Sequence, residues 1–156
     1  MKNIIILVED AIYANDGYKS RIEMEMGILG EEFNFIVLAP LLSGKPINFS
    51  LNNVTVLKYK ALPSYVPFVF NKRKMLRALN LTLEKYKNSI VMCEALPSAV
   101  CVHKFCKKRG IKFVFDCHGT APDEVYMYHN NFFGYIFSKW LRKKQKKVVS
   151  EAALTV

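Results

Sequence analysis

Residues 3–8 read NIIILV, an unbroken apolar run dominated by β-branched side chains. The run lacks the apolar–polar alternation of a strand with one wet face. It therefore predicts a strand buried on both faces, as in a parallel sheet covered by helices. Outward from this strand, further strands are predicted at residues 34–39 (NFIVLA, ended by Pro40), 54–59, 89–93 and 111–116.

Apolar residues with helical spacing separate these strands. Ile22, Met26 and Leu29 recur on one face of a predicted helix, Asn71 stands where it can cap the next helix, and Gly110 closes the third. Helices are predicted over residues 18–30, 71–87, 97–109 and 133–148. Strands that alternate with helices predict a single doubly wound α/β domain, with a mostly parallel sheet and helices on both faces.

The composition is that of a basic globular domain. The chain has 156 residues, enough for one domain with a substantial core, and 51% of them are hydrophobic, which argues against disorder. The formal charge is +10, from 23 basic and 13 acidic residues. Such an excess indicates an anionic partner, either a membrane surface, a nucleic acid or a phosphorylated substrate.

The cysteines and the N-terminus indicate the compartment. None of the four cysteines belongs to a C-x-x-C pair or to a set with zinc spacing, so we interpret them as free thiols in a reducing compartment and expect no metal. The N-terminal apolar run is too short for a signal peptide, and no run is long enough to span a membrane. We therefore expect a cytoplasmic protein, with peripheral association at the inner face of the membrane left open.

The predicted strand order places several polar residues at one edge of the sheet. In the common order 3-2-1-4-5, ligands bind beyond the carboxyl ends of the strands, where the order reverses between the first and fourth strands. Three loops converge there. They contribute Gly17, Tyr18 and Lys19 after the first strand, Glu94 after the fourth, and His118, Gly119 and Thr120 after the fifth.

The segment FVFDCHGTAPDE, residues 113–124, carries the candidate catalytic residue, His118. Its imidazole titrates near neutral pH, Gly119 would leave room for a ligand, and Asp116 could orient the ring. The alternative is an ordinary loop histidine bonded to backbone. The loop after the first strand has one glycine, Gly17, and neither phosphate-loop fingerprint, so a nicotinamide or P-loop nucleotide site is disfavoured. Two interpretations stay open: Gly17 allows close approach of the backbone to an anion attracted by the N-terminus of the following helix, or the segment is a plain turn.

The last predicted helix combines aromatic and basic residues. Phe133, Ile136, Phe137, Trp140 and Leu141 share one face, and lysines crowd the rest. This pattern favours an interfacial membrane helix or a helix that binds an anionic lipid carrier. The residues predicted to make that contact are Trp140, Arg142, Lys143, Lys144 and Lys147. The alternative is a helix that packs its aromatic residues on the sheet and leaves its lysines in water.

Four segments together form a recognisable pattern. They are NIIILVED with NDGYKSR, RIEMEMGILGEEFNFIVLAP, FVFDCHGTAPDE and VVSEAALTV, which span nearly the whole chain. The pattern resembles the N-terminal, acceptor-side domain of GT-B-fold retaining glycosyltransferases of the glycosyltransferase family 4 type. Many members carry two adjacent glycines after the first strand, whereas this chain has Gly17 alone.

The resemblance implies that residues 1–156 form a Rossmann-like acceptor domain and that the donor-binding C-terminal domain is absent. It implies that His118 contacts the transferred sugar, that Gly17 faces the donor phosphates, and that Glu124 is the acid that follows the HG segment. The implied reaction is hexosyl transfer with retention, from a nucleotide-sugar to a cell-surface polysaccharide or lipid-linked acceptor. The resemblance further implies that no cofactor or obligatory metal takes part, and that the isolated chain is inactive.

Two other interpretations are kept beside this one. A non-enzymatic basic α/β module that binds nucleic acid or anionic lipid would explain the charge, although no RNA-binding signature is present. A flavodoxin-like or response-regulator-like domain would need an acidic cluster and a phosphate loop after the first strand. The ending SEAALTV reads as the start of a sixth strand. We therefore expect that the chain is a fragment, which can self-associate through an uncovered interface. The alternative is that Thr155 and Val156 are the frayed tail of a complete small domain.

Overall fold

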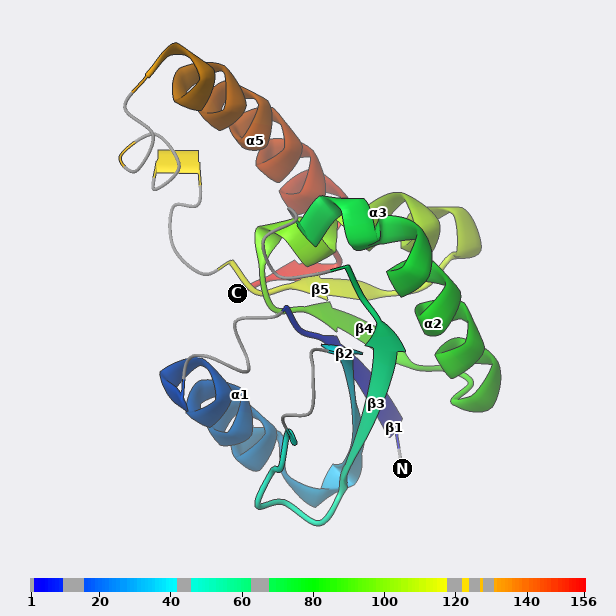
Figure 1. The fold of residues 1–156 in the computed structure, drawn as a ribbon. Coiled ribbons are helices and arrows are strands. Elements are labelled where there is room, and N and C mark those ends of the chain that lie inside the picture. Colours follow the sequence, from blue (N-terminus) through cyan, green and yellow to red (C-terminus); the bar gives the residue numbers. More distant parts are fainter. Residues whose placement is uncertain are drawn as a thin grey trace.

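A six-stranded, all-parallel sheet forms the centre of the fold (Figure 1). The computed structural model describes residues 2–9, 16–41, 46–62, 68–117, 122–123, 127 and 131–156. The strand order is β3-β2-β1-β4-β5-β6, which confirms the predicted order of the first five strands. The strands are β1 (Lys2–Leu7), β2 (Phe33–Leu41), β3 (Val54–Lys60), β4 (Ile90–Cys93), β5 (Phe113–Phe115) and β6 (Leu154–Thr155).

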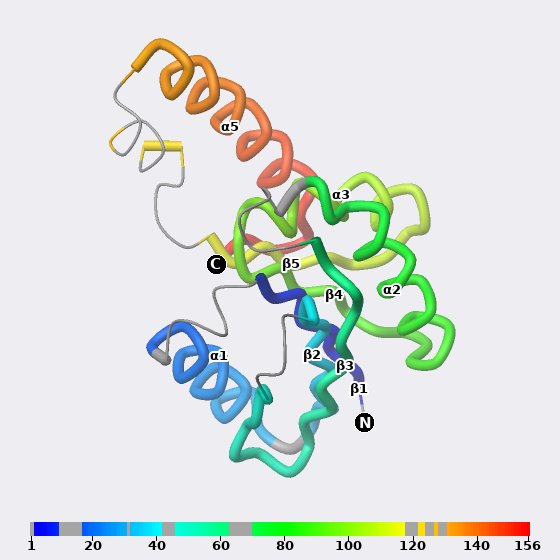
Figure 2. Tube along the Cα trace, in the orientation of Figure 1, coloured from blue at the N-terminus to red at the C-terminus, as the bar shows by residue number. Residues whose placement is uncertain are grey.

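Helices cover both faces of the sheet, as expected. The described helices of more than one turn are α1 (Asp16–Leu29), α2 (Lys72–Lys85), α3 (Leu96–Arg109) and α5 (Phe132–Glu151). In Figures 1 and 2, α1 lies on one side of the sheet, and α2, α3 and α5 lie on the other. The two faces therefore carry separate hydrophobic cores.

The first strand shows why the apolar run has no alternation. Ile5 and Leu7 belong to the core beneath α2 and α3, whereas Ile4 and Ile6 belong to the core beneath α1. Side chains on a strand alternate between faces, so a strand with helices on both faces must be apolar at every position. Each fully buried Ile or Leu contributes about 1.5–3 kcal/mol of hydrophobic free energy.

Three local predictions were wrong. Pro40 lies inside β2, because β1 ends at Leu7 opposite Leu38 and no longer requires an N–H from β2 at Pro40. Leu29, the last residue of α1, is 41% exposed, so it lies outside the core that buries Ile22 and Met26. Asn71 makes no side-chain cap on α2; its Oδ1 accepts a hydrogen bond from the backbone N–H of Leu62 at 2.7 Å.

Helix α5 begins and ends with specific polar contacts. Asn131 caps it by accepting the N–H of Gly134 at 2.8 Å, and α5 begins at Phe132, one residue before the predicted start of the last helix. At the other end, Glu151 Oε2 lies 2.6 Å from His103 Nδ1, and Glu151 Oε1 lies 3.1 Å from Lys107 Nζ. These contacts fix the C-terminal part of α5 to α3.

The N-terminal part of α5 leaves its aromatic side chains in solvent. Its buried positions are Gly134, Ser138, Leu141 and Val148. The aromatic residues that were expected on an apolar face are exposed, and Figure 2 shows this end of the helix pointing away from the sheet. The alternative in which they pack on the sheet is therefore wrong. Within the described part of the chain, no helix is both long enough and apolar enough to cross a membrane.

Candidate functional site

Two acidic side chains stand next to each other at the carboxyl edge of the sheet. Glu94 follows β4, and its N–H donates to Leu7 O at 3.2 Å. Asp116 follows β5, and its N–H donates to Cys93 O at 2.9 Å. These bonds continue the parallel ladder for one residue beyond each strand. They place both carboxyl groups at the point where the strand order reverses, where ligands bind in open α/β sheets.

Arg21 of α1 joins these acids. Its Nη2 lies 2.8 Å from Glu94 Oε2 and 3.0 Å from Asp116 Oδ2, and its Nη1 lies 3.3 Å from Glu25 Oε1. The Arg21 side chain is 30% exposed, whereas that of Glu94 is 0% exposed. The Arg21 side chain is therefore only partly buried, as is that of Glu25 at 27% exposed, whereas the two strand-end acids with which Arg21 pairs are buried.

Burial changes the acidity of this cluster. It raises the pKa of Glu94 to about 8, with a further rise from the charges of Glu25 and Asp116 against the opposing effect of Arg21. Burial also raises the pKa of Asp116 to about 6, although the Arg21 charge opposes this shift. Near neutral pH, Glu94 is therefore mostly protonated, while Asp116 is mostly ionised and balances the guanidinium.

Tyr18 and Glu9 extend the cluster toward α3. Burial raises the pKa of Tyr18 well above its usual range, and the negative charges of Glu94 and Glu9 add to this effect. Glu9 Oε1 accepts a hydrogen bond from the backbone N–H of Ser98 at 3.3 Å, in the first turn of α3. A carboxylate at this position is stabilised by the helix dipole. The ends of β1, α1 and α3 are thus tied together around Arg21.

The structure describes four of the eight residues predicted to bind substrate or to act on it. Gly17 lies in the first turn of α1 rather than in a loop, and it is exposed. Tyr18 and Glu94 are brought to the Arg21 cluster, and Glu94 is enclosed beneath the surface. Lys19 Nζ lies over the ring of Phe49, 5.9 Å from its centroid. His118, Gly119, Thr120 and Glu124 lie outside the described residues.

Arg21 was missed by sequence reasoning. The signal available was its spacing, because Tyr18, Arg21, Ile22 and Glu25 fall within one stripe of α1 that also holds buried Met26. A charged residue in a stripe that faces the core needs a buried partner. Two acids that directly follow buried strands are natural partners for such a cation.

The same carboxylates have the composition of a metal site. Glu25, Glu94 and Asp116 offer oxygens that lie within 4.8 Å of one another. The guanidinium of Arg21 is within ion-pair distance of all three, so an organic cation already supplies the positive charge at this position. The expectation that no metal takes part stays a prediction.

The predicted membrane contacts on α5 fall on two sides of the helix. Trp140, Lys143, Lys144 and Lys147 share the outer face, since successive residues are about 100° apart. Trp140 stacks on Phe137 with ring centroids 5.5 Å apart, and Lys144 Nζ lies 5.3 Å from its centroid. Arg142 instead lies on a flank of the helix and pairs with Asp123.

The parallel sheet, its crossover helices and the polar cluster at its switch point define a Rossmann-like α/β domain. Among solved structures, the chain is similar to apo UGT2 from Phytolacca americana, with a TM-score of 0.55 and 11% identity over 83% of this chain. The chain spans 32% of the length of that protein. No protein-family model matches the sequence, and no curated protein matches it significantly. At this identity the likeness shows a shared fold.

Proposed function

We propose that the chain is the acceptor-side domain of a retaining glycosyltransferase, which works with a donor-binding domain outside residues 1–156. The whole enzyme would transfer a hexose from a nucleotide-sugar to a lipid-linked or polysaccharide acceptor. The four family-like segments of the sequence support this proposal. So does the fold shared with UGT2, whose abbreviated name denotes a UDP-glycosyltransferase.

The observation that carries the proposal is the cation held at the switch point. Sugar transfer breaks the bond between the anomeric carbon and a phosphate oxygen, and negative charge develops on the departing nucleoside diphosphate. A guanidinium that is fixed before the reaction stabilises such charge without having to reorient. Arg21 meets this requirement because Glu94 and Asp116 hold it at 2.8 and 3.0 Å. In this role Glu94 is a positioning residue for Arg21.

The remaining roles are those that the family resemblance of the sequence implies. His118, two residues after Asp116, would contact the transferred sugar, with Gly119 and Thr120 beside it and Glu124 in the segment that follows. Gly17, in the first turn of α1, would lie close to a donor phosphate, which the positive end of the helix dipole favours. Tyr18 and Lys19 would line the same side of the crevice.

The test is sugar transfer by the protein joined to its donor-binding domain. Arg21→Gln and His118→Ala should each lower kcat/KM for transfer from a radiolabelled nucleotide-sugar by about 100-fold or more, the effect typical of losing one transition-state contact. Arg77→Gln, which removes an exposed charge from α2, is the matched control and should keep the wild-type rate. Undiminished transfer by both site variants would remove the assigned roles.

A second activity, peripheral membrane binding, is favoured by one specific observation. Phe133 and Ile136 are 80% and 50% exposed, and they precede a run of lysines on the same helix. A helix with exposed aromatic residues at one end, followed by lysines, is suited to binding an anionic bilayer. The rings would enter the interface, and the lysines would contact the headgroups. This activity fits a transferase with a lipid-linked acceptor. It also fits the alternative of a non-enzymatic basic module, for which anionic lipid is then favoured over nucleic acid.

A further inference from the structure

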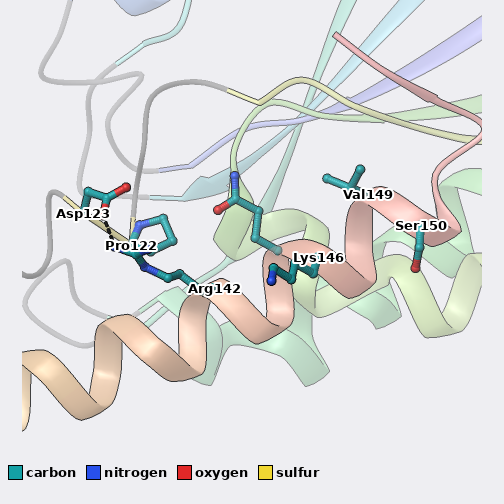
Figure 3. Close-up of a pocket in the computed structure, with 7 residues that line it drawn as sticks. Pro122, Asp123, Arg142, Lys146, Val149 and Ser150 are labelled. Carbon is teal, nitrogen blue, oxygen red and sulfur yellow. Dashed lines mark hydrogen bonds and ion pairs between the residues drawn. The ribbon is translucent and has the colours of Figure 1, made fainter.

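A cavity outside the Arg21 cluster lies between α5 and the short helical segment Pro122–Asp123. It has a volume of about 550 Å³, within the range of about 300–1,000 Å³ that is usual for small-molecule sites. Figure 3 shows Arg142 extending from α5 toward Asp123, with Lys146, Val149 and Ser150 further along the helix. The lining residues are Pro122, Asp123, Arg142, Gln145, Lys146, Val149 and Ser150.

The lining carries a net positive charge. Arg142 Nη2 donates to Asp123 Oδ1, which uses one of the five N–H donors of the guanidinium. Among the described residues, no other hydrogen bond or ion pair uses the remaining donors. None of the ion pairs among the described residues involves Lys146. Gln145 and Ser150 add neutral polar groups, whereas Pro122 and Val149 are apolar. A planar guanidinium next to an ammonium is the combination that binds phosphate oxygens strongly.

The cavity adjoins the candidate site through β5. Gln145 Nε2 donates to Cys117 Sγ at 3.2 Å, and Cys117 directly follows Asp116, which pairs with Arg21. Its lining residues lie on a flank of α5, whereas the aromatic residues and most lysines of the outer face point elsewhere. A ligand in the cavity therefore lies next to the end of β5 without covering the outer face of α5.

We propose that this cavity is a subsite for a phosphate monoester or diphosphate group of the acceptor, held by Arg142 and Lys146. The inference deepens the proposed function and rests on it for the word acceptor, since it assigns the chemical class of that substrate. The phosphate is carried either by a lipid at the membrane surface or by a soluble phosphorylated sugar. The same two cations serve both sources.

The experiment measures binding without sugar transfer. The chain is titrated with inorganic pyrophosphate and followed by calorimetry, and the Arg142→Gln/Lys146→Gln variant is compared with Lys72→Gln/Lys74→Gln. The two variants lose the same charge, but only the first pair lines the cavity, whereas Lys72 and Lys74 are exposed on α2. We expect the first variant to bind pyrophosphate at least about tenfold more weakly, and the control to change by less than about twofold. Equal weakening in both variants, or the absence of saturable binding by the wild type, overturns the proposal.

A second arm distinguishes the two sources. Phosphatidylcholine vesicles are doped with either phosphatidic acid, which exposes a phosphate monoester, or phosphatidylglycerol, which does not. A preference of the wild type for phosphatidic acid that is lost in Arg142→Gln/Lys146→Gln supports a lipid-borne phosphate. Binding of pyrophosphate with no preference between the vesicles supports a soluble one. Neither arm measures sugar transfer, so the two proposals are tested independently. A negative binding result would not affect the transferase assay, and a negative transferase assay would not affect the measured phosphate binding.

Discussion

Arg21 is the residue on which the candidate site depends. Its guanidinium is 30% exposed and spans Glu94 and Asp116, which come from two different strands. Asp116 is mostly ionised near neutral pH and would cost several kcal/mol without its cation, so Asp116 and Arg21 should be coupled in stability. The site therefore has a measurable signature in stability as well as in activity.

The pH dependence of stability should report the state of Glu94. Its pKa rises from 4.5 in the unfolded chain to about 8 in the fold, so between these pH values the folded protein holds a proton that the unfolded chain has lost. Stability contributed by this group is therefore greatest at low pH and falls as the pH rises toward 8. Glu94→Gln cannot titrate and should flatten this fall.

Urea unfolding of the wild type and of Glu94→Gln, at about pH 5 and about pH 8, measures the effect. From about pH 5 to about pH 8, the wild type should lose more unfolding free energy than Glu94→Gln does, by on the order of 2 kcal/mol or more. Glu84→Gln, which changes an exposed glutamate on α2, is the control and should track the wild type. Parallel pH profiles for Glu94→Gln and the wild type would contradict the raised pKa.

The two ends of helix α5 differ in their surroundings. Its C-terminal part is fixed by Leu141 and Val148 in the core and by the contact between Glu151 and His103. Its N-terminal part carries exposed aromatic residues that nothing in the described structure covers. An exposed apolar surface next to a lysine run is the candidate surface for the proposed membrane binding, because globular domains seldom leave large apolar patches in water.

Trp140 is the one tryptophan of the chain and therefore a built-in reporter for this surface. Mixing the protein with vesicles of phosphatidylcholine and phosphatidylglycerol at low salt should shift its fluorescence emission to shorter wavelength, since its indole would leave water. Pure phosphatidylcholine should give little shift. Lys143→Gln/Lys147→Gln should weaken the binding by about tenfold or more, because each lysine near an anionic surface contributes about 1 kcal/mol.

The control for this measurement is Lys72→Gln/Lys74→Gln, which removes the same charge from exposed positions on α2 and should bind vesicles like the wild type. An emission spectrum unchanged by anionic vesicles at low salt would remove the membrane interpretation of α5. Added salt should reverse the binding, because salt shortens the Debye length over which the lysines attract the anionic headgroups.

Under the proposed function, the chain would supply only the acceptor side of the active site. The Arg21 cluster opens at the carboxyl edge of the sheet, and the chain spans 32% of the structurally similar UGT2. A donor-binding domain would have to close over this edge, because transfer requires both substrates to be held against each other and kept from water.

Residues 1–156 alone should therefore transfer no sugar from radiolabelled nucleotide-sugars, whereas the protein joined to its donor-binding domain should. The measurement is label incorporated into lipid-extractable or polymeric product. Transfer by the isolated chain above background would show that the second domain is not required, and it would overturn this part of the proposal.

The sequence by itself determined the architecture, because apolar periodicity is a local property. NIIILV could only be a strand covered on both faces, and Gly110, with a φ of +65°, marked the end of α3 correctly. The strand order, and with it the edge at which that order reverses, was predicted correctly because strand order follows from a few connection rules. At that edge, Glu94 was named from the end of its strand and Tyr18 from the segment after the first strand.

Only the tertiary structure decided what depends on neighbours from distant parts of the chain. Arg21 became a site residue because β4 and β5, more than seventy residues away, place Glu94 and Asp116 beneath it. Pro40 is tolerated in β2 because β1 has already ended, and the aromatic residues of α5 are exposed because the helix leaves the sheet. A sequence pattern shows which side chains share a face of a helix or strand. Packing decides which face is buried and which charged side chains are brought into contact.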